Sequence, residues 1–329
     1  MARVAVVFTG GTISMSFDAA AGGNVPSLDG AAILARTPGL DAIADVVAID
    51  RGLTPASHFS FADILGIGTR VQQALDDPAI AGAVVVQGTD TIEETSFAWD
   101  LTVASPKPVV VTGAMRAAHA DGYDGPANLR RAVAAAAAPV LRGAGVVVCL
   151  AGSLEAADDV TKLHSTALDT FGSPNNGRLG SVGDDGTVTI GRTRGSRRSI
   201  SPVPADGAVV HHVQAGIGTD GALLDAAVVA GARGIVVAAT GAGNTHPGLL
   251  AAAERAIADG VVVALASRCV AGAVSTAYAF PGGGATWIRA GAIATGTLCA
   301  IKARVALALA LGAGQARDDI AVLLADPVG

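Results

Sequence analysis

The sequence contains little cysteine and little aromatic residue for its length. Its three cysteines, Cys149, Cys269 and Cys299, are odd in number and lie far apart. That pattern argues against a disulfide framework and against a zinc site, so buried reduced thiols are expected. Aromatic residues make up 3% of the chain, whereas glycine occurs 43 times. The core must therefore be built from small aliphatic side chains that let helices and strands pack closely.

Charge is also scarce, at 15% of residues with a net charge of −6. This balance gives no basic surface for a nucleic acid, and we expect none as a partner. The one basic cluster, Arg192 to Arg198, is short and is predicted to be a solvated linker. The acid pairs Asp158-Asp159 and Asp184-Asp185 are predicted to be turn and surface charges.

Long membrane-spanning runs are absent from the sequence although the mean hydropathy is +0.51. The longer uncharged runs, Gly234 to Ala253 and Cys269 to Ile288, are interrupted by glycine, proline, asparagine or histidine. They do not suit a spanning helix, and a soluble protein without membrane association is expected. A core strand begins by Val4, which leaves no room for a signal peptide and predicts a cytoplasmic location.

Short aliphatic runs alternate with segments of helical periodicity along the chain. This alternation predicts an α/β fold in two domains, each a mainly parallel sheet flanked by helices. The predicted strands are residues 4–8, 41–49, 83–86, 108–111, 145–150, 209–213, 234–239 and 261–266, and the predicted helices are residues 31–34, 61–75, 92–103, 129–138, 223–230, 249–258 and a closing helix at 303–311. We expect a larger domain at residues 1–190, a linker at 191–207 and a smaller domain at 208–329.

Polar turns follow several predicted strands of the first domain. Thr12 follows the first, Thr89 and Asp90 follow the third, Ala114 follows the fourth, and Lys162 comes after the fifth. Ligands of parallel sheets bind beyond the carboxyl ends of the strands, so these residues are expected at one edge. The glycine-rich segment from residue 14 to residue 30 reads as a mobile loop that could close over this edge as a lid.

A hydroxyl, a carboxylate and a lysine together form a plausible nucleophile system. A threonine is a weak nucleophile until a base removes its proton, and a partly buried lysine can act as that base. Asp90 could orient Lys162 or hold a substrate ammonium group. The alternatives are that Thr89 and Asp90 only cap a helix and that Lys162 is a surface residue.

Binding of a phosphate or a metal is less consistent with the sequence. The turn at Gly10-Gly11-Thr12 matches neither the dinucleotide glycine spacing nor the phosphate-binding loop with its lysine. The six histidines show no ligand spacing, and His211 and His212 point to opposite faces of one strand. No metal and no cofactor are expected.

The order and spacing of several short motifs together resemble the bacterial-type L-asparaginases and asparaginase/glutaminases. Each motif alone is weak, but jointly they are specific and they cover nearly the whole chain. The motifs are Thr9-Gly-Gly-Thr12-Ile13, Gln87-Gly-Thr89-Asp90-Thr91-Ile-Glu-Glu94-Thr95, Thr112-Gly-Ala-Met-Arg116, Asp124-Gly-Pro126, Asp159-Val-Thr-Lys162, Gly241-Ala-Gly-Asn244, Ser267-Arg268 and Gly296-Thr297-Leu298.

This resemblance implies a cofactor-free amidohydrolase that converts L-asparagine and water into L-aspartate and ammonia. It also implies a homotetramer, built as a dimer of dimers with each site at a subunit interface. Thr12 is similar to the family's nucleophile, which forms an acyl-enzyme, and Thr89, Asp90 and Lys162 resemble its second catalytic set. The substrate-binding positions that the resemblance implies are Gly11, Ser57, Gly88, Thr89, Asp90, Ala114 and, from the neighbouring subunit, Asn244.

The chain departs from the family pattern at two places. Family members with a mobile lid usually carry a tyrosine there, but residues 14–30 contain none, and the chain has only Tyr123 and Tyr278. Many secreted members also supply a glutamate from the neighbouring subunit, and the matching region, Val274 to Phe280, has no acid. Both departures favour a cytoplasmic relative.

Three functions fit these residues. The first is an asparaginase with weaker activity on glutamine or D-asparagine. The second is a glutaminase-asparaginase or a related amidase with a different amide preference. The third is a non-catalytic amino-acid sensor that kept the pocket and lost the lid chemistry.

Overall fold

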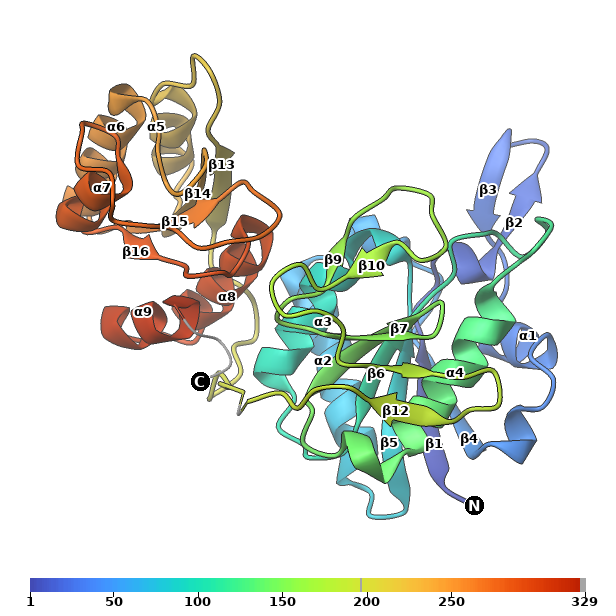
Figure 1. The fold of residues 1–329 in the computed structure, drawn as a ribbon. Coiled ribbons are helices and arrows are strands. Elements are labelled where there is room, and N and C mark those ends of the chain that lie inside the picture. The colour runs from blue at the N-terminus through green and yellow to red at the C-terminus, as the bar shows by residue number, and fades with distance from the viewer. Residues whose placement is uncertain (196, 326–329) are drawn as a thin grey trace. The chain divides into compact units, whose positions relative to one another are not determined.

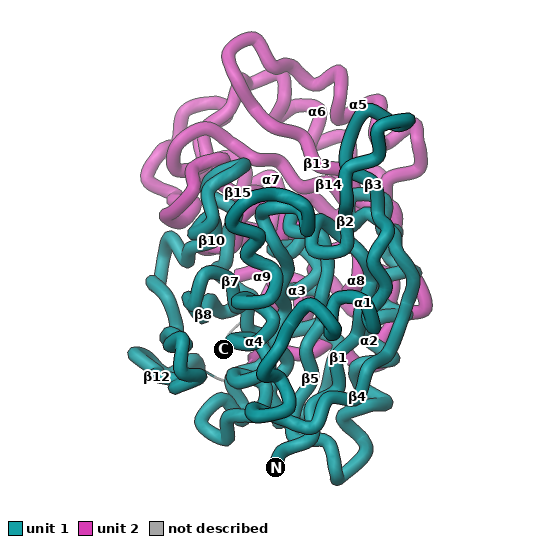
Figure 2. The backbone as a smooth tube through the Cα atoms, turned by 90° about the vertical axis from the view of Figure 1, so that its right-hand side faces the viewer, with its two compact units in different colours: residues 1–195 teal, residues 196–329 magenta. Residues whose placement is uncertain are grey.

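The computed structural model describes residues 1–195 and 197–325, and the chain divides into two compact units between residues 195 and 196 (Figure 2). The first unit is the larger of the two. The division falls inside the range 191–207, and the role of that range as a linker stays a prediction.

Helices and strands alternate through most of both units (Figure 1). The helices are α1 (Gly30–Ala35), α2 (Phe61–Asp76), α3 (Ile92–Thr102), α4 (Gly125–Ala137), α5 (Ala222–Val229), α6 (Pro247–Ala258), α7 (Gly284–Ala290), α8 (Ala300–Gly312) and α9 (Arg317–Ala325). The strands are β1 (Arg3–Phe8), β2 (Met15–Asp18), β3 (Gly23–Pro26), β4 (Asp45–Asp50), β5 (Ile80–Val86), β6 (Val109–Thr112), β7 (Val146–Leu150), β8 (Ser153–Ala156), β9 (Thr161–Lys162), β10 (Phe171–Gly172), β11 (Gly180–Val182), β12 (Val188–Ile190), β13 (Val210–Gln214), β14 (Gly234–Ala239), β15 (Val262–Ser267) and β16 (Ile293–Ala294).

The first unit is built on an eight-stranded sheet in the order β12-β11-β8-β7-β6-β5-β1-β4. The strands from β4 to β7 are parallel, and β8, β11 and β12 extend the sheet in antiparallel fashion. The prediction of a mainly parallel α/β sheet is confirmed. The antiparallel extension was not predicted, because strands of three or four residues are too short to show a periodicity.

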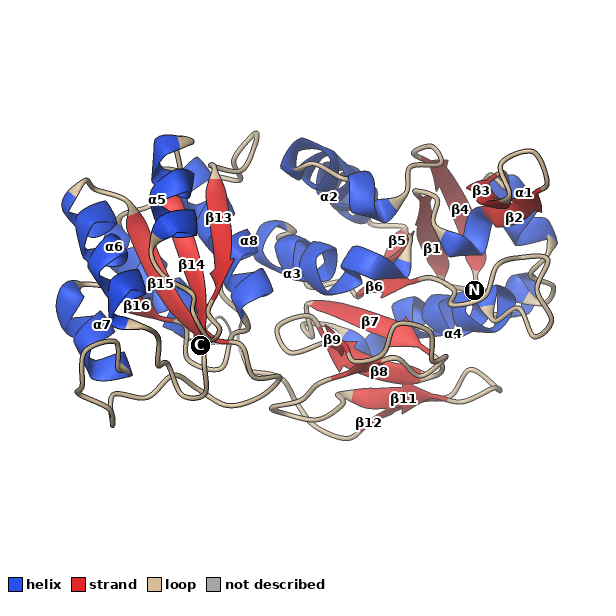
Figure 3. Ribbon diagram, turned by 90° about the horizontal axis from the view of Figure 1, so that it is seen from above, coloured by secondary structure: helices blue, strands red, loops and turns tan. Residues whose placement is uncertain are grey.

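Successive side chains of each buried strand point to opposite faces of this sheet. Val6 and Val84 belong to a core cluster with residues of α1 and α4, whereas Val7 and Val85 pack with α2 and α3. Figure 3 shows α2 and α4 on opposite sides of the sheet. A strand covered on both faces has to be aliphatic throughout, which is what the sequence of β1 provides.

The second unit carries a parallel four-stranded sheet in the order β13-β14-β15-β16. Helices α5, α6 and α7 pack on one face, and α8 contacts β13, β14 and β15. A Cβ atom on Gly234 would lie 2.8 Å from the Leu307 side chain of α8, so glycine at this position permits close packing. Helix α8 does not close the fold as predicted, because α9 follows it.

The segment predicted as a mobile loop at residues 14–30 contains a β-hairpin of β2 and β3. The carboxylate of Asp18 accepts hydrogen bonds from the N–H groups of Ala20 and Ala21, which shapes the hairpin turn. At the base, Ser27 and Leu28 donate their N–H groups to the Ser14 carbonyl. The hairpin escaped prediction because its strands are only four residues long. Each carries a single aromatic or β-branched residue, Phe17 in β2 and Val25 in β3, which is too few to mark a strand.

Two predictions about charged residues are wrong. The Arg194 side chain is 2% exposed and forms ion pairs with Asp100 and Asp158, whose side chains are 1% and 7% exposed. Asp159 is also buried, and it accepts N–H groups of Asn175 and Asn176. Arg194 is therefore not part of a solvated linker, and the pair Asp158-Asp159 does not lie at the surface. These charges are buried because each has a partner of opposite charge or a backbone donor.

The expectation of buried thiols holds for Cys149, and its burial raises the pKa of the thiol to about 12. It is wrong for Cys269, which is exposed because it lies in the loop after β15. In the described parts of the chain, no helix is long and apolar enough to cross a membrane.

Candidate active site

The first turn of the candidate site follows β1 and depends on two glycines. Gly10 and Gly11 have φ values of 105° and 93°, which side-chain-bearing residues rarely adopt. A Cβ atom on Gly11 would lie 2.1 Å from the backbone nitrogen of Gly88. The turn after β1 therefore touches the turn after β5, and Thr12 begins a short 3₁₀ turn directly after this contact.

Lys162 reaches the turn after β5 from β9. Its Nζ atom donates hydrogen bonds to Thr89 Oγ1 at 3.0 Å and to Asp90 Oδ1 at 2.8 Å. The Lys162 side chain is 14% exposed, whereas that of Asp90 is 73% exposed. Thr89 and Asp90 are adjacent in the sequence and Lys162 lies 72 positions after Asp90, yet the three residues come together, as the prediction of one shared edge requires.

This arrangement has a chemical consequence for Thr89. Because the lysine ammonium occupies one lone pair of the Thr89 oxygen, the hydroxyl proton of Thr89 must point away from Lys162. Thr89 itself is buried. A buried hydroxyl held in this way can donate its proton to a ligand or accept one in a directed manner.

Ser57 and Ala114 come from segments that contact the same turn. Ser57 is exposed in the 3₁₀ turn Ala56–His58, and the Thr91 hydroxyl donates to the Ala56 carbonyl at 3.2 Å. Ala114 is buried and follows Gly113, where a Cβ atom would lie 2.5 Å from the Gln87 carbonyl oxygen. Within the first unit, the predicted residues therefore come from segments that contact one another.

Asn244 belongs to the second unit, in the turn after β14. Its backbone pairs with Thr240, and its side-chain Oδ1 atom is buried without a hydrogen-bond partner in the described structure. A buried unpaired amide oxygen is costly unless a partner or ligand satisfies it. Its contribution to the site stays a prediction.

Tyr123 was not predicted as a site residue. Its hydroxyl donates to the Ile13 carbonyl at 2.8 Å, next to Thr12 in the chain. Burial, opposed by the charge of Arg36, raises the pKa of Tyr123 to about 12, so the hydroxyl stays protonated. The only signal in the sequence is that the first unit contains a single tyrosine.

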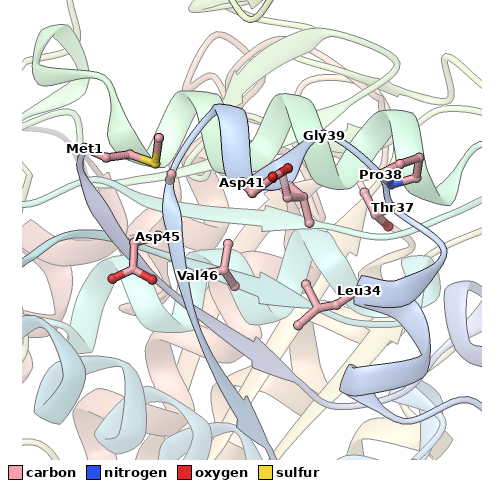
Figure 4. Close-up of a pocket in the computed structure, with 10 residues that line it drawn as sticks. Met1, Leu34, Thr37, Pro38, Gly39, Asp41, Asp45 and Val46 are labelled. Carbon is pink, nitrogen blue, oxygen red and sulfur yellow. The ribbon is translucent and has the colours of Figure 1, made fainter.

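A cavity of about 570 Å³ lies elsewhere in the first unit (Figure 4). It is lined mainly by residues around Met1, Leu34, Gly39 and Val46. Met1 precedes β1 and Val46 lies near the start of β4, so this cavity is at the amino ends of the parallel strands. Ligands of such sheets bind at the other edge, and none of the predicted site residues lines the cavity.

Comparison with known proteins gives a consistent result for both units. Residues 3–194 match the family model described as asparaginase, N-terminal, and residues 209–324 match that of the glutaminase/asparaginase C-terminal domain. A protein of Deinococcus radiodurans named "Probable L-asparaginase" is 34% identical over 329 residues, covering 97% of this chain and 95% of its own. The "Probable L-asparaginase periplasmic" of Haemophilus influenzae is 39% identical over 239 residues, 70% of this chain and 66% of its own.

A solved structure supports the same relationship. It is that of a "Probable Cytoplasmic L-asparaginase" from Campylobacter jejuni, which superposes with a TM-score of 0.87 at 29% identity. The match covers 98% of this chain and 99% of the other. The two-unit α/β fold is therefore that of the Campylobacter protein.

Proposed function

This chain belongs to the asparaginase family, and on that premise we propose that it hydrolyses the side-chain amide of L-asparagine to give L-aspartate and ammonia. The observation that carries the proposal is the contact of Lys162 Nζ with both Thr89 and Asp90. Gly11 touches Gly88, the residue before Thr89. Thr12 is the next residue after Gly11, so it lies beside the turn that carries Thr89 and Asp90. An amidohydrolase that works through a threonine needs such groups together.

In the first step, the Thr12 hydroxyl oxygen attacks the side-chain carbonyl carbon of asparagine. A C–O bond forms, the C–N bond breaks, and the proton of Thr12 passes to the departing nitrogen, which leaves as ammonia. The backbone around Gly11, Gly88 and Ala114 contacts the reacting amide. The product of this step is an ester between Thr12 and the aspartyl group.

In the second step, water attacks the ester carbonyl carbon. The bond to Thr12 breaks, one proton of the water returns to the Thr12 oxygen, and aspartate is released. We assign this proton transfer to Thr89 and Lys162, because Lys162 holds the Thr89 hydroxyl in a fixed direction. General acid–base catalysis of this kind contributes about 10²- to 10⁴-fold.

Ser57 and Asp90 recognise the amino-acid end of the substrate. The Asp90 carboxylate is largely exposed, and its Oδ1 atom accepts a hydrogen bond from Lys162. The other carboxylate oxygen can therefore accept a hydrogen bond from an α-ammonium group. The exposed hydroxyl of Ser57 can donate to the α-carboxylate. Asn244 of a neighbouring subunit completes the site. The enzyme is a homotetramer built as a dimer of dimers. Its location is the cytoplasm.

A substrate panel tests the proposal. Ammonia release is measured at steady state with L-asparagine, L-glutamine and D-asparagine under identical conditions. We expect the highest kcat/KM with L-asparagine and about 10- to 200-fold less with L-glutamine, since one extra methylene changes binding by about 1–3 kcal/mol.

Each alternative function has its own outcome in this panel. A higher kcat/KM with glutamine would replace the proposal by a glutaminase-asparaginase. Ammonia only from longer or modified amides would indicate another amidase. Binding of asparagine by calorimetry without any ammonia release would establish an amino-acid sensor.

A further inference from the structure

The 3₁₀ turn Thr12–Ser14 depends on a side chain from a distant part of the chain. The carbonyls of Gly11, Thr12 and Ser14 accept hydrogen bonds from backbone N–H groups of the same region. The carbonyl of Ile13 instead accepts from the Tyr123 hydroxyl at 2.8 Å. Ile13 is fully buried, so the loss of this donor would leave a buried carbonyl without its partner.

The ring of Tyr123 is itself held in place. It is partly buried against the core cluster that contains Ile13, Phe8 and Ala114. A Cβ atom on Gly125 would lie 2.4 Å from the ring, so the ring rests directly on the backbone at the start of α4. The hydroxyl therefore approaches Ile13 from a fixed direction.

The neighbouring residue, Asp124, holds a second part of the site. Its carboxylate accepts the N–H groups of Met115 and Arg116, which follow Ala114, and the side-chain amide of Asn128. Two consecutive residues thus hold two turns of the site. Tyr123 holds the turn of Thr12, and Asp124 holds the turn that follows Ala114.

We propose that Tyr123 is a positioning residue for the reaction, which fixes the Thr12 turn through its hydrogen bond to the Ile13 carbonyl. This inference deepens the proposed function, because it concerns the residue next to the assigned nucleophile. The hydroxyl of Tyr123 is hydrogen-bonded to the Ile13 carbonyl, so Tyr123 acts through the Thr12 turn. It determines how accurately Thr12 faces the amide, and a displacement of about 1 Å can lower the rate about 100-fold.

The test compares Tyr123→Phe with wild type. This variant keeps the ring and removes only the hydroxyl. We expect kcat for L-asparagine to fall about 10- to 100-fold while KM changes less than about twofold, because Ser57 and Asp90 are untouched. We also expect amide hydrogen exchange of a peptide spanning residues 9–18 to accelerate at least about tenfold, because its turn opens more often.

Thr37→Val is the matched control. The Thr37 hydroxyl is buried in the same unit and donates to the Ile33 carbonyl at 2.8 Å, among the residues that line the cavity at the other edge of the sheet. This variant loses a comparable hydrogen bond, and we expect kcat and the exchange of peptide 9–18 to remain as in wild type.

Three results would overturn the inference. The first is exchange of peptide 9–18 in Tyr123→Phe equal to that of wild type, the second is an unchanged kcat of Tyr123→Phe when the wild type is active, and the third is an equal drop of kcat in Thr37→Val. Hydrogen exchange separates this inference from the proposed function, because it is measurable even if the wild-type protein releases no ammonia. In that case the function fails while faster exchange in Tyr123→Phe still shows that the hydroxyl holds the turn.

Discussion

Both units carry polar turns at the ends of parallel strands, but the hydroxyl groups compared below have different hydrogen-bond partners. In the second unit, the hydroxyls of Thr240 and Ser267 both donate to backbone carbonyls of the same unit, those of Asn244 and Gly241. In the first unit, the hydroxyl of Thr89 receives a hydrogen bond from a lysine side chain. A hydroxyl bonded to its own backbone stabilises a turn, whereas a hydroxyl held by a lysine can take part in chemistry.

A buried ion-pair cluster of the first unit contrasts with an exposed ion pair of the second. Arg194 of the first unit is buried with both of its acidic partners. Arg255 of the second unit pairs with Asp225 at 2.8 Å, but these side chains are 59% and 48% exposed. Breaking the buried pairs of Arg194 should therefore cost more stability than breaking the exposed pair of Arg255.

The largest expected effect concerns Thr12. We expect Thr12→Ala to reduce ammonia release from asparagine by about 10⁴-fold or more, because the covalent nucleophile is lost. Ser267→Ala in the second unit is the counterpart, and its kcat should remain within about threefold of wild type. Near-normal turnover by purified, folded Thr12→Ala would contradict the assignment of Thr12 as the nucleophile.

A slightly smaller loss is expected for Lys162→Met. This change keeps much of the side-chain volume and removes the donor to Thr89 and Asp90, so kcat should fall about 10²- to 10⁴-fold. Circular dichroism should match that of wild type. If kcat were unchanged, Lys162 would have only the structural role that its ion pair with Asp90 gives it.

The buried and the exposed ion pairs are expected to differ in their contribution to the free energy of unfolding. Arg194→Met removes the buried cation that pairs with Asp100 and Asp158, and we expect the free energy of unfolding of the first unit to fall by about 3–5 kcal/mol. Arg255→Met removes an exposed pair worth about 0–1 kcal/mol. Denaturant unfolding of both variants measures the difference, and equal losses would contradict it.

The sequence predicted those elements whose pattern is regular and long enough to see. Helix α2 is an example, since its apolar residues recur at helical spacing and Ser60 with Asp63 forms a capping box at its start. Strand β1 was equally clear as a continuous aliphatic run. The hairpin of β2 and β3 and the short antiparallel strands have no such pattern.

The candidate site was predictable only in part, for a related reason. The turn motifs place Thr12, Thr89 and Asp90 at strand ends, and the topology of parallel sheets then brings these ends together. The burial of Arg194 depends on Asp100 and Asp158, which lie far from it in sequence, and no local pattern reveals such pairing. Tyr123 escaped notice likewise, because its partner is a backbone carbonyl 110 residues away.

The contact between Gly11 and Gly88 limits how this enzyme can be redesigned. Any side chain at position 11 would separate the two backbones, so the turn of Thr12 and the turn of Thr89 can shift only as a pair. An attempt to fit a larger amide by moving one of them would disturb the other. Changes in substrate size are better sought among side chains outside this contact, which can be exchanged without displacing either turn.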